Sequence, residues 1–306
     1  MKTINTSTAL ASKKAVRLKR DAKAWALISP FLLLVILLVW YPQIMSFVWS
    51  LFEMVGYNRG KFVGIDNYVN VIKDTLFPKV FMNTLSYVFW SLVLGYLPPI
   101  IVALLLNEVV HFKNGFRFCI YFPAILPGVA VSLMWYLIFF PDEGGMLNMF
   151  INMFGGKTQL WLQNPKMSIP LIIFTSTWRG MPGAMLLYYS VLQSVNRELY
   201  EAAVIDGAGV FKRVFTVTLP QISGTMLIVL VRQIIGVFQI LEEPMAMTGG
   251  GPNNASISLA YLAYKQGIIN FRVGPSMALG TILFVLIVVL TIFYFKINKI
   301  VEEKQG

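Results

Sequence analysis

Six long apolar segments constrain this chain more than any other feature of its sequence. A helix that crosses the hydrocarbon core of a bilayer needs about 17 to 25 mostly apolar residues. The composition agrees with such helices, because 57% of the 306 residues are hydrophobic and only 13% are charged. We therefore predict an all-α polytopic membrane protein with six transmembrane helices, at Ala24–Tyr41, Leu85–Leu106, Phe118–Phe140, Ile169–Leu192, Ile222–Leu241 and Ala278–Phe295.

The first apolar segment follows a basic stretch, as a signal peptide does. Its apolar run is too long for a signal peptide, and no small-residue cleavage site follows it, so we interpret it as an uncleaved first helix. Residues 1–23 then form a basic N-terminal segment, 24–296 the membrane domain and 297–306 a C-terminal tail. For Lys13–Lys23, a basic helix on the membrane surface and a disordered charged tail both remain open.

The formal net charge of +11 is distributed unevenly. Six spans place both termini on one side, and most of the 25 Lys and Arg residues lie there, in the tails and in loops 107–117 and 193–221. Because cytoplasmic segments are enriched in Lys and Arg, we predict a multi-pass protein of the cytoplasmic membrane with both termini in the cytoplasm. The basic charge indicates topology and attraction to lipid headgroups, and we expect no nucleic-acid partner.

The sequence offers little material for a metal site or a catalytic site. It has one cysteine, Cys119, in an apolar run and one histidine, His111, in a short basic loop. No cluster has metal-ligand spacing, so we expect no metal and no cofactor bound by this chain. Residues 155–158 (GGKT) superficially resemble a phosphate-binding loop, but that pattern requires a glycine where Ile151 stands. We therefore expect that this chain is not an enzyme.

The loop 196–220 is the most informative polar segment. Asn196 is a good N-cap for a short helix, and Gly207 is the kind of residue that ends one just past its C-terminus. A second helical stretch, Val210–Thr218, then leads into the fifth predicted span. The loop should present small residues on a surface that a partner approaches closely.

This loop resembles the signature loop of permease subunits in ATP-driven (ABC) importers. That signature reads Glu-Ala-Ala, two residues, Asp-Gly-Ala, eight residues, Ile-x-Leu-Pro, and Val217 in place of Ile is the one departure. The matching residues are Glu201, Ala202, Ala203, Asp206, Gly207, Ala208, Leu219 and Pro220. Further segments are similar to the carbohydrate-uptake branch, of the maltose or glycerol-3-phosphate type: Phe62–Tyr68, Pro141-Asp142, Leu147-Asn148, Trp161-Leu162 and Thr248–Pro252.

The resemblance implies a type I importer fold, similar to the maltose permease, with a cytoplasmic coupling helix. It also implies the partners: ABC ATPase subunits that carry ATP and Mg, a second homologous permease, an extracytoplasmic solute-binding protein and a sugar. Glu201 would pair with a basic residue of the ATPase, Ala202 and Ala203 would allow close packing, and Gly207 would allow the turn.

A glycine run in the last outer loop has two interpretations. It is a flexible loop formed by turn chemistry alone, or, by resemblance, it reaches into a docked binding protein. The run consists of Thr248, Gly249, Gly250, Gly251 and Pro252.

Two arginines stand near the middle of predicted spans, Arg179 in the fourth and Arg232 in the fifth. A mid-membrane arginine costs about 2.5–3.5 kcal/mol on insertion scales, so neither should face lipid. Either they pair structurally, within this subunit or with the partner permease, or they line a solute cavity. If both line it, an anionic solute is expected, such as a uronate-containing oligosaccharide or a phosphorylated polyol. Gln233 and Gln239 could bind sugar hydroxyls, and Trp178 could stack on a sugar ring.

The leading hypothesis is thus one permease subunit of a binding-protein-dependent sugar importer. The main alternative is a secondary transporter or channel that works alone on a small polar solute. Such proteins commonly contain inverted repeats, and we find no internal repeat here. An exporter membrane domain is a third possibility, disfavoured by the importer signature.

Overall fold

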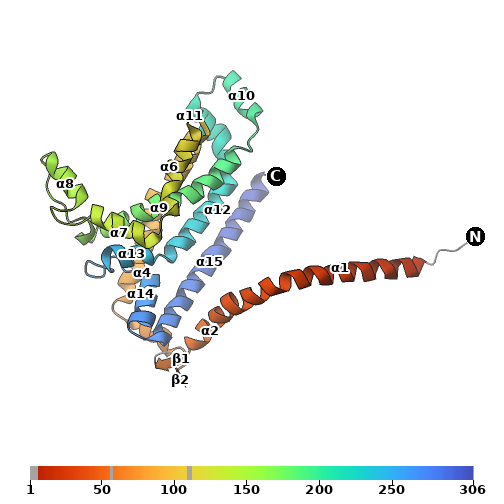
Figure 1. Ribbon diagram of the computed structural model, residues 1–306, viewed down its shortest axis with the longest axis horizontal. Helices are drawn as coiled ribbons and strands as arrows, with labels where there is room; N and C mark the ends of the chain where they lie inside the picture. The colour runs from red at the N-terminus through yellow and green to blue at the C-terminus, as the bar shows by residue number, and fades with distance from the viewer. Residues whose placement is uncertain (1–5, 56–57, 109–111, 306) are drawn as a thin grey trace, which may run out of the picture.

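The computed structural model describes residues 6–55, 58–108 and 112–305, so His111 lies outside the described residues. The prediction of a mostly helical protein is confirmed. The one exception among the described residues is a short antiparallel hairpin of β1 (Phe52–Val55) and β2 (Asn58–Phe62), which the sequence analysis did not predict. In Figure 1 this hairpin lies at the opposite end of the molecule from helix α10 (Arg197–Ile205).

Four helices of the described chain are long and apolar enough to cross a membrane, and each overlaps a predicted span. They are Asp21–Trp49, Phe77–Glu108, Val210–Phe238 and Val273–Lys296. Three contain a π-helical turn, so the structure divides them into α1 (Thr6–Val35), η1 (Ile36–Trp40) and α2 (Tyr41–Trp49); α4 (Phe77–Trp90), η2 (Ser91–Gly95) and α5 (Leu97–Glu108); and α11 (Val210–Arg213), η4 (Val214–Thr218) and α12 (Leu219–Phe238). The fourth belongs to α15 (Val273–Gln305).

The third predicted span is not one continuous helix, which corrects the prediction. Helices α6 (Lys113–Ile125) and α7 (Gly128–Ile138) meet at an angle of 97°. Pro127 explains the break, because proline lacks a backbone N–H and forces the preceding residue out of the helical region. Leu126 accordingly has ψ 141.

Helix α9 (Ser168–Leu192) is the centre of the bundle. It contacts α4, α5, α6, α7, α12 and α13 (Glu242–Thr248). Its side chains Ile172, Ile173 and Met185 are completely buried. At 25 residues it is long enough to cross a bilayer, but it is less apolar than the four helices above and is not counted among them. A helix surrounded by other helices can carry hydroxyl groups and an arginine that would be costly against lipid.

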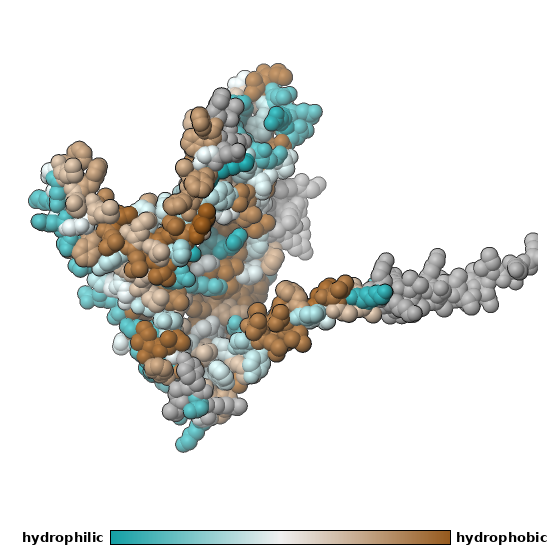
Figure 2. All heavy atoms as spheres, in the orientation of Figure 1, coloured by the Kyte–Doolittle hydropathy of each residue, from teal (hydrophilic) through white to brown (hydrophobic). Residues whose placement is uncertain are grey.

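Helix α1 stands apart from the bundle (Figure 1). Residues 6–23 are helical and continue into the first span, which favours a helix over a disordered tail for the basic segment. No residue in the apolar window of Asp21–Trp49 is buried. Figure 2 shows apolar side chains along the described part of this helix and over much of the body. Such an apolar surface needs lipid or another chain to cover it.

Buried asparagines hold together two of the segments that connect the long helices. The Asn67 side chain, in α3 (Asp66–Lys73), donates hydrogen bonds to the carbonyls of Ser50, 2.8 Å, and Phe52, 2.9 Å. It thereby fixes the hairpin to the outer end of α15, where Gly274 leaves room for the Asn67 amide. The segment Phe62–Tyr68, which resembles the carbohydrate branch, thus contains a structural anchor.

Asn148, in α8 (Met146–Met153), likewise anchors the segment between α7 and α9. Its fully buried side chain donates to the carbonyls of Phe140, Asp142 and Gln159 and accepts from the Gln159 N–H and the Trp161 indole N–H. One side chain therefore joins both ends of the loop. The remaining short elements are η3 (Trp161–Gln163), α14 (Leu259–Tyr264) and η5 (Lys265–Ile269).

We predict that Asn148→Ala lowers the thermal midpoint of the detergent-solubilised protein by several degrees. Each buried carbonyl left without a donor costs about 1–3 kcal/mol. Size-exclusion chromatography after heating measures the effect. The matched control is Asn152→Ala on the same helix, whose exposed side chain makes one 3.3 Å hydrogen bond to Thr158. Equal midpoints for the two variants would contradict the anchoring role.

Candidate functional site

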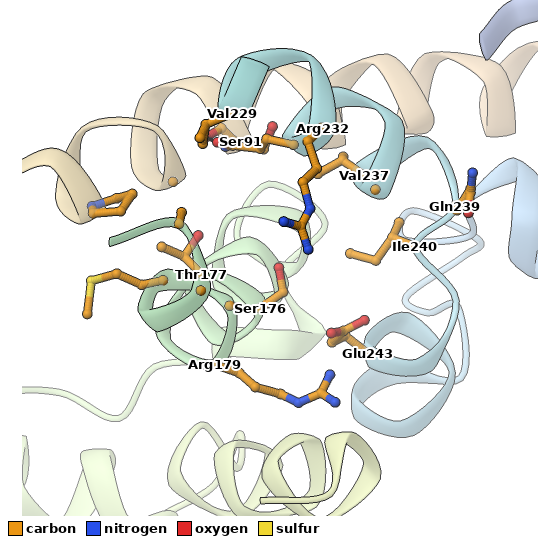
Figure 3. A pocket seen from close by; sticks show the side chains of 18 of the residues that line it. Ser91, Ser176, Thr177, Arg179, Val229, Arg232, Val237, Gln239, Ile240 and Glu243 are labelled. Carbon is orange, nitrogen blue, oxygen red and sulfur yellow. Dashed lines mark hydrogen bonds between the residues drawn. The ribbon is translucent and has the colours of Figure 1, made fainter. Parts of the chain in front are cut away.

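A cavity of about 570 Å³ lies beside α9, in the middle of the bundle. Its walls come from the α4–α5 junction, from α9, from the C-terminal half of α12 and from the start of α13 (Figure 3). Arg179, Arg232, Gln233 and Gln239, which the sequence analysis placed on a solute path, all line it. Their role in binding solute stays a prediction.

Arg179 lies near the middle of α9 and faces Glu242, the first residue of α13. Arg179 Nη1 and Glu242 Oε2 are 3.9 Å apart, and both side chains are partly exposed to the cavity. The pair rests on Gly128, the first residue of α7: a Cβ there would overlap Glu242 Oε2 and come within 2.8 Å of Arg179 Nη1. The break at Pro127 therefore ends in a glycine that makes room for the ion pair.

Arg232 forms no ion pair with any residue that the structure describes. Figure 3 shows its side chain extending from α12 into the cavity. The helix runs from Val210 to Phe238, and Arg232 lies six residues before its C-terminal end; its depth in the membrane stays a prediction. The cavity thus contains one arginine with a counter-ion and one without.

The two predicted glutamines differ in their contacts. Gln233 donates a hydrogen bond from its amide nitrogen to the carbonyl of Ser91, the first residue of η2. Gly95 accommodates it, because a Cβ there would lie 2.8 Å from Gln233 Nε2 and 2.9 Å from Thr177 Oγ1. Gln233 is therefore a link between α12 and the π turn. Gln239 is exposed at the C-cap of α12, and its side chain has no hydrogen bond within the described chain.

Trp178, also predicted on the solute path, is not among the residues that line the cavity. Its ring packs edge-to-face on Trp135 of α7, with centroids 5.6 Å apart, and Phe174 lies edge-on to the same Trp135 ring at 5.1 Å. The structure places Trp178 in an aromatic cluster between α7 and α9, where it packs those helices together.

Glu242 and Glu243 were missed by the sequence analysis, although both line the cavity. They fall just after the predicted end of the fifth span at Leu241. The signal that could have found them is the Glu-Glu-Pro run itself, since acidic residues favour the first turn of a helix and the run directly follows an apolar segment. Burial raises the pKa of the Glu243 carboxyl, and the nearby Arg179 opposes this shift.

The loop 196–220 folds as predicted at both ends of its first helix. The Asn196 side chain accepts a hydrogen bond from the Glu198 N–H at 3.1 Å, which is an N-cap. At the other end, Gly207 has φ 71, and the N–H groups of residues 207 and 208 donate to the carbonyls of Val204 and Ala203. This is a Schellman motif. A Cβ at residue 207 would meet no atom within 4 Å, so the backbone angle alone calls for glycine.

Helix α10 projects from the bundle, and its surface is unusually apolar for an exposed loop. Glu201 and Ala202 are exposed, and so are Ile205, at 85%, and Phe211 of α11, at 82%. In Figures 1 and 2, α10 forms the end of the molecule opposite the hairpin, where hydrophilic side chains also gather. Exposed apolar side chains rimmed by polar ones are typical of a protein-binding surface.

One side-chain hydrogen bond joins α10 to the helix that follows. Tyr200 Oη and Thr218 Oγ1 are 3.1 Å apart. Thr218 ends η4, and Leu219 packs in the core beside α5 and α9. The π turn lies directly before Pro220 and allows the helix to continue past a residue that cannot donate a backbone hydrogen bond.

The glycine run Thr248–Pro252 forms a compact turn; its flexibility and its contact with a binding protein stay predictions. Thr248 Oγ1 donates to the Pro244 carbonyl at 2.8 Å and lies 2.7 Å from Ser256 Oγ. Gly249 and Gly250 have φ 58 and 87. Thr248, Gly249, Gly251 and Pro252 border a second hollow of about 590 Å³ between this turn and the end of α7. The turn is therefore held in one shape beside an opening.

Comparison with known proteins agrees with this architecture. The family model described as "Binding-protein-dependent transport system inner membrane component" matches residues 95–302. The chain is 30% identical over 281 residues to the arabinooligosaccharides transport system permease protein AraP of Bacillus subtilis (strain 168), with 91% of this chain and 89% of that protein covered. It is 30% identical over 277 residues to the sn-glycerol-3-phosphate transport system permease protein UgpA of Escherichia coli O6:K15:H31, with 89% and 92% covered.

The fold is also similar to a solved structure. That structure is a bacterial ABC transporter involved in the import of the acidic polysaccharide alginate, with a TM-score of 0.83 and 22% sequence identity. The match covers 94% of this chain and 98% of that chain. At this identity the likeness shows the fold alone.

We predict that Gly128→Ala displaces the Arg179–Glu242 pair and lowers the thermal midpoint of the solubilised protein. The atoms that the new methyl group meets are the ends of two flexible, partly exposed side chains, so the cost lies at or below the low end of the about 1–3 kcal/mol typical of overpacking. Gly183→Ala is the matched control, because Gly183 lines the same cavity yet a Cβ there meets nothing within 4 Å. A midpoint for Gly128→Ala as high as that of the control would show that the pair does not rest on this glycine.

Proposed function

Because this chain belongs to the family of binding-protein-dependent transport system inner membrane components, we propose that it forms one permease half of an importer that carries a sugar or oligosaccharide. It is a transport subunit of an ATP-driven importer in the bacterial inner membrane and no enzyme. The resemblance to importer permeases found in the sequence is thereby confirmed. The stand-alone transporter and the exporter fit this family less well and are not pursued.

The observation that carries the sugar proposal is the polar cavity beside α9. Six long polar side chains line a space of about 570 Å³ within an apolar bundle: Arg179, Arg232, Gln233, Gln239, Glu242 and Glu243. Binding sites are concave, with a few polar groups that fix the ligand's orientation. The amides and guanidinium groups suit a solute rich in hydroxyl groups, and two relatives are named for the transport of arabinooligosaccharides and of sn-glycerol-3-phosphate.

We propose that six crossings form the membrane domain, 24–296. Besides the four long apolar helices, α9 would cross within a shell of other helices, and α6 with α7 would make a broken crossing. The burial of α9 on several sides and its length support this count. Both termini would then lie in the cytoplasm with α10, in agreement with the distribution of Lys and Arg.

We propose that α10 is the coupling helix and binds an ABC ATPase subunit. The exposed Glu201 would pair with a basic side chain of that subunit, and Ala202 and Ala203 would let the surfaces approach. ATP and Mg would bind to the ATPase chains. Such an element works only if it binds the ATP-loaded and free partner differently. A second permease and an extracytoplasmic binding protein would complete the importer, with Thr248–Pro252 as a candidate contact for the latter.

We predict that Gly207→Pro abolishes uptake by the assembled importer while membrane insertion persists. Proline fixes φ near −65°, whereas residue 207 has φ 71. The matched control is Gly209→Pro two residues later, where φ is −64 and a Cβ would meet no atom within 4 Å. Radiolabelled sugar uptake and immunoblots of membranes measure the two properties. Equal loss in both variants would point to general damage to the loop.

We also predict that Glu201→Lys abolishes uptake by reversing the charge presented to the ATPase. Site-directed crosslinking from residue 202 to the ATPase should disappear together with uptake. ATP-dependent uptake that continues at the normal rate would exclude this contact. Uptake by the purified chain in vesicles without ATP would overturn the proposed function as a whole.

A further inference from the structure

The two arginines of the cavity differ in whether a carboxylate lies close enough to offset their positive charge. Arg179 has Glu242 as its counter-ion, 3.9 Å away, whereas Arg232 has none within the described chain. Both face the same cavity, together with Glu243. A charge with a nearby counter-charge attracts a second anion weakly, because most of its field is cancelled. Arg179 and Arg232 are therefore unequal binding groups.

The Arg179–Glu242 pair is built into the bundle. The two residues come from α9 and α13, and both lie close to Gly128 of α7, where no side chain intervenes. The Glu242 side chain is 53% exposed, so its carboxylate borders the cavity and remains solvated. It therefore contributes a negative charge to the space where a solute would bind.

The two remaining ionisable groups that line the cavity are Arg232 and Glu243. Burial raises the pKa of the Glu243 carboxyl. With Arg179 paired with Glu242, Arg232 is the arginine of the cavity lining that has no ion pair among the described residues. A pair of free arginines would favour polyanionic solutes, whereas one free arginine suits a solute with one anionic group or none.

We propose that Glu242 is a charge-specificity determinant: it neutralises Arg179, leaves Arg232 as the cation open to solute, and makes the importer favour neutral or singly anionic sugars over polyanionic ones. This inference rests on the proposed function for its solute and on the cavity's geometry for its electrostatics. The relatives carry solutes of different charge, from arabinooligosaccharides to sn-glycerol-3-phosphate, so a device that sets charge preference has a purpose in this family.

The electrostatic part can be tested without any solute. Ser176 lines the cavity one helical turn before Arg179. In a Cys119→Ser background, Ser176→Cys would react with an anionic and with a cationic methanethiosulfonate reagent in the reconstituted complex. The ratio of the two rates reports the local potential. Asn270→Cys, in an exposed outer loop, is the reference position that should not respond.

Opposite substitutions should move this ratio in opposite directions. Glu242→Gln should raise the anion-to-cation ratio about tenfold and Arg179→Gln should lower it about tenfold, since one unit charge at close range is removed in each case. The double variant should return to the parent value, and Glu242→Asp should leave it unchanged. A ratio that does not move, or that moves in the same direction in both single variants, would overturn the proposal even if one of them assembles poorly.

Uptake tests the consequence for solutes. The complete importer, with its own binding protein, would be given a trisaccharide with no uronate, with one and with two. Glu242→Gln should raise uptake of the doubly charged sugar relative to the singly charged one several-fold, and an unchanged preference would refute the specificity role. If no sugar is carried by any variant while the thiol rates shift as expected, the proposed function fails and the electrostatic assignment stands.

Discussion

A guanidinium group halfway along α9 cannot face hydrocarbon without a cost of about 2.5–3.5 kcal/mol or more. The arrangement of the bundle answers this constraint. Helix α9 contacts six other helices, and Arg179 borders a cavity in which Glu242 is its counter-ion. Apolar side chains on the surface of the bundle can then face lipid or another chain, while these polar groups border the cavity. The central place of α9 is therefore compatible with the charge that it carries.

Breaks in helical hydrogen bonding recur around the same space. The π turn η2, the proline break between α6 and α7, and the end of α12 all lie beside the cavity or next to a residue that does. Backbone groups freed at such points need another partner inside a membrane protein. Gln233 shows how this is met, since its amide binds the Ser91 carbonyl at the start of η2. The Gln233 side chain therefore binds a backbone carbonyl and also lines the cavity.

Features set by local chemistry could be predicted from the sequence, and features set by packing could not. The caps at Asn196 and Gly207 follow from short-range hydrogen bonds and a backbone angle, and both are found where expected. Hydropathy located four spans that overlap the long apolar helices, because membrane thickness sets a minimum length. It did not locate their ends: the fifth predicted span begins at Ile222, whereas the helix begins at Val210. It could not reveal the right-angled bend at Pro127, since a proline within a span is compatible with a mild kink or a full break. Glu242 was missed for a similar reason: the importance of its charge depends on a partner 63 residues away along the chain.

The helix Val210–Phe238 connects the two regions of interest without interruption. It begins just after the loop that follows α10, and Arg232 and Gln233, near its C-terminal end, line the cavity. At about 1.5 Å per residue, it spans roughly 40 Å. Under the proposed coupling role of α10, a displacement at the N-terminal end of this helix would reach the cavity side chains near its C-terminal end, because a continuous helix resists compression. Tyr200 is bonded to Thr218 in this helix, and Gln233 is bonded to the Ser91 carbonyl in the π turn η2, between α4 and α5. A partner that moves α10 would therefore change the cavity through two hydrogen bonds and one helix.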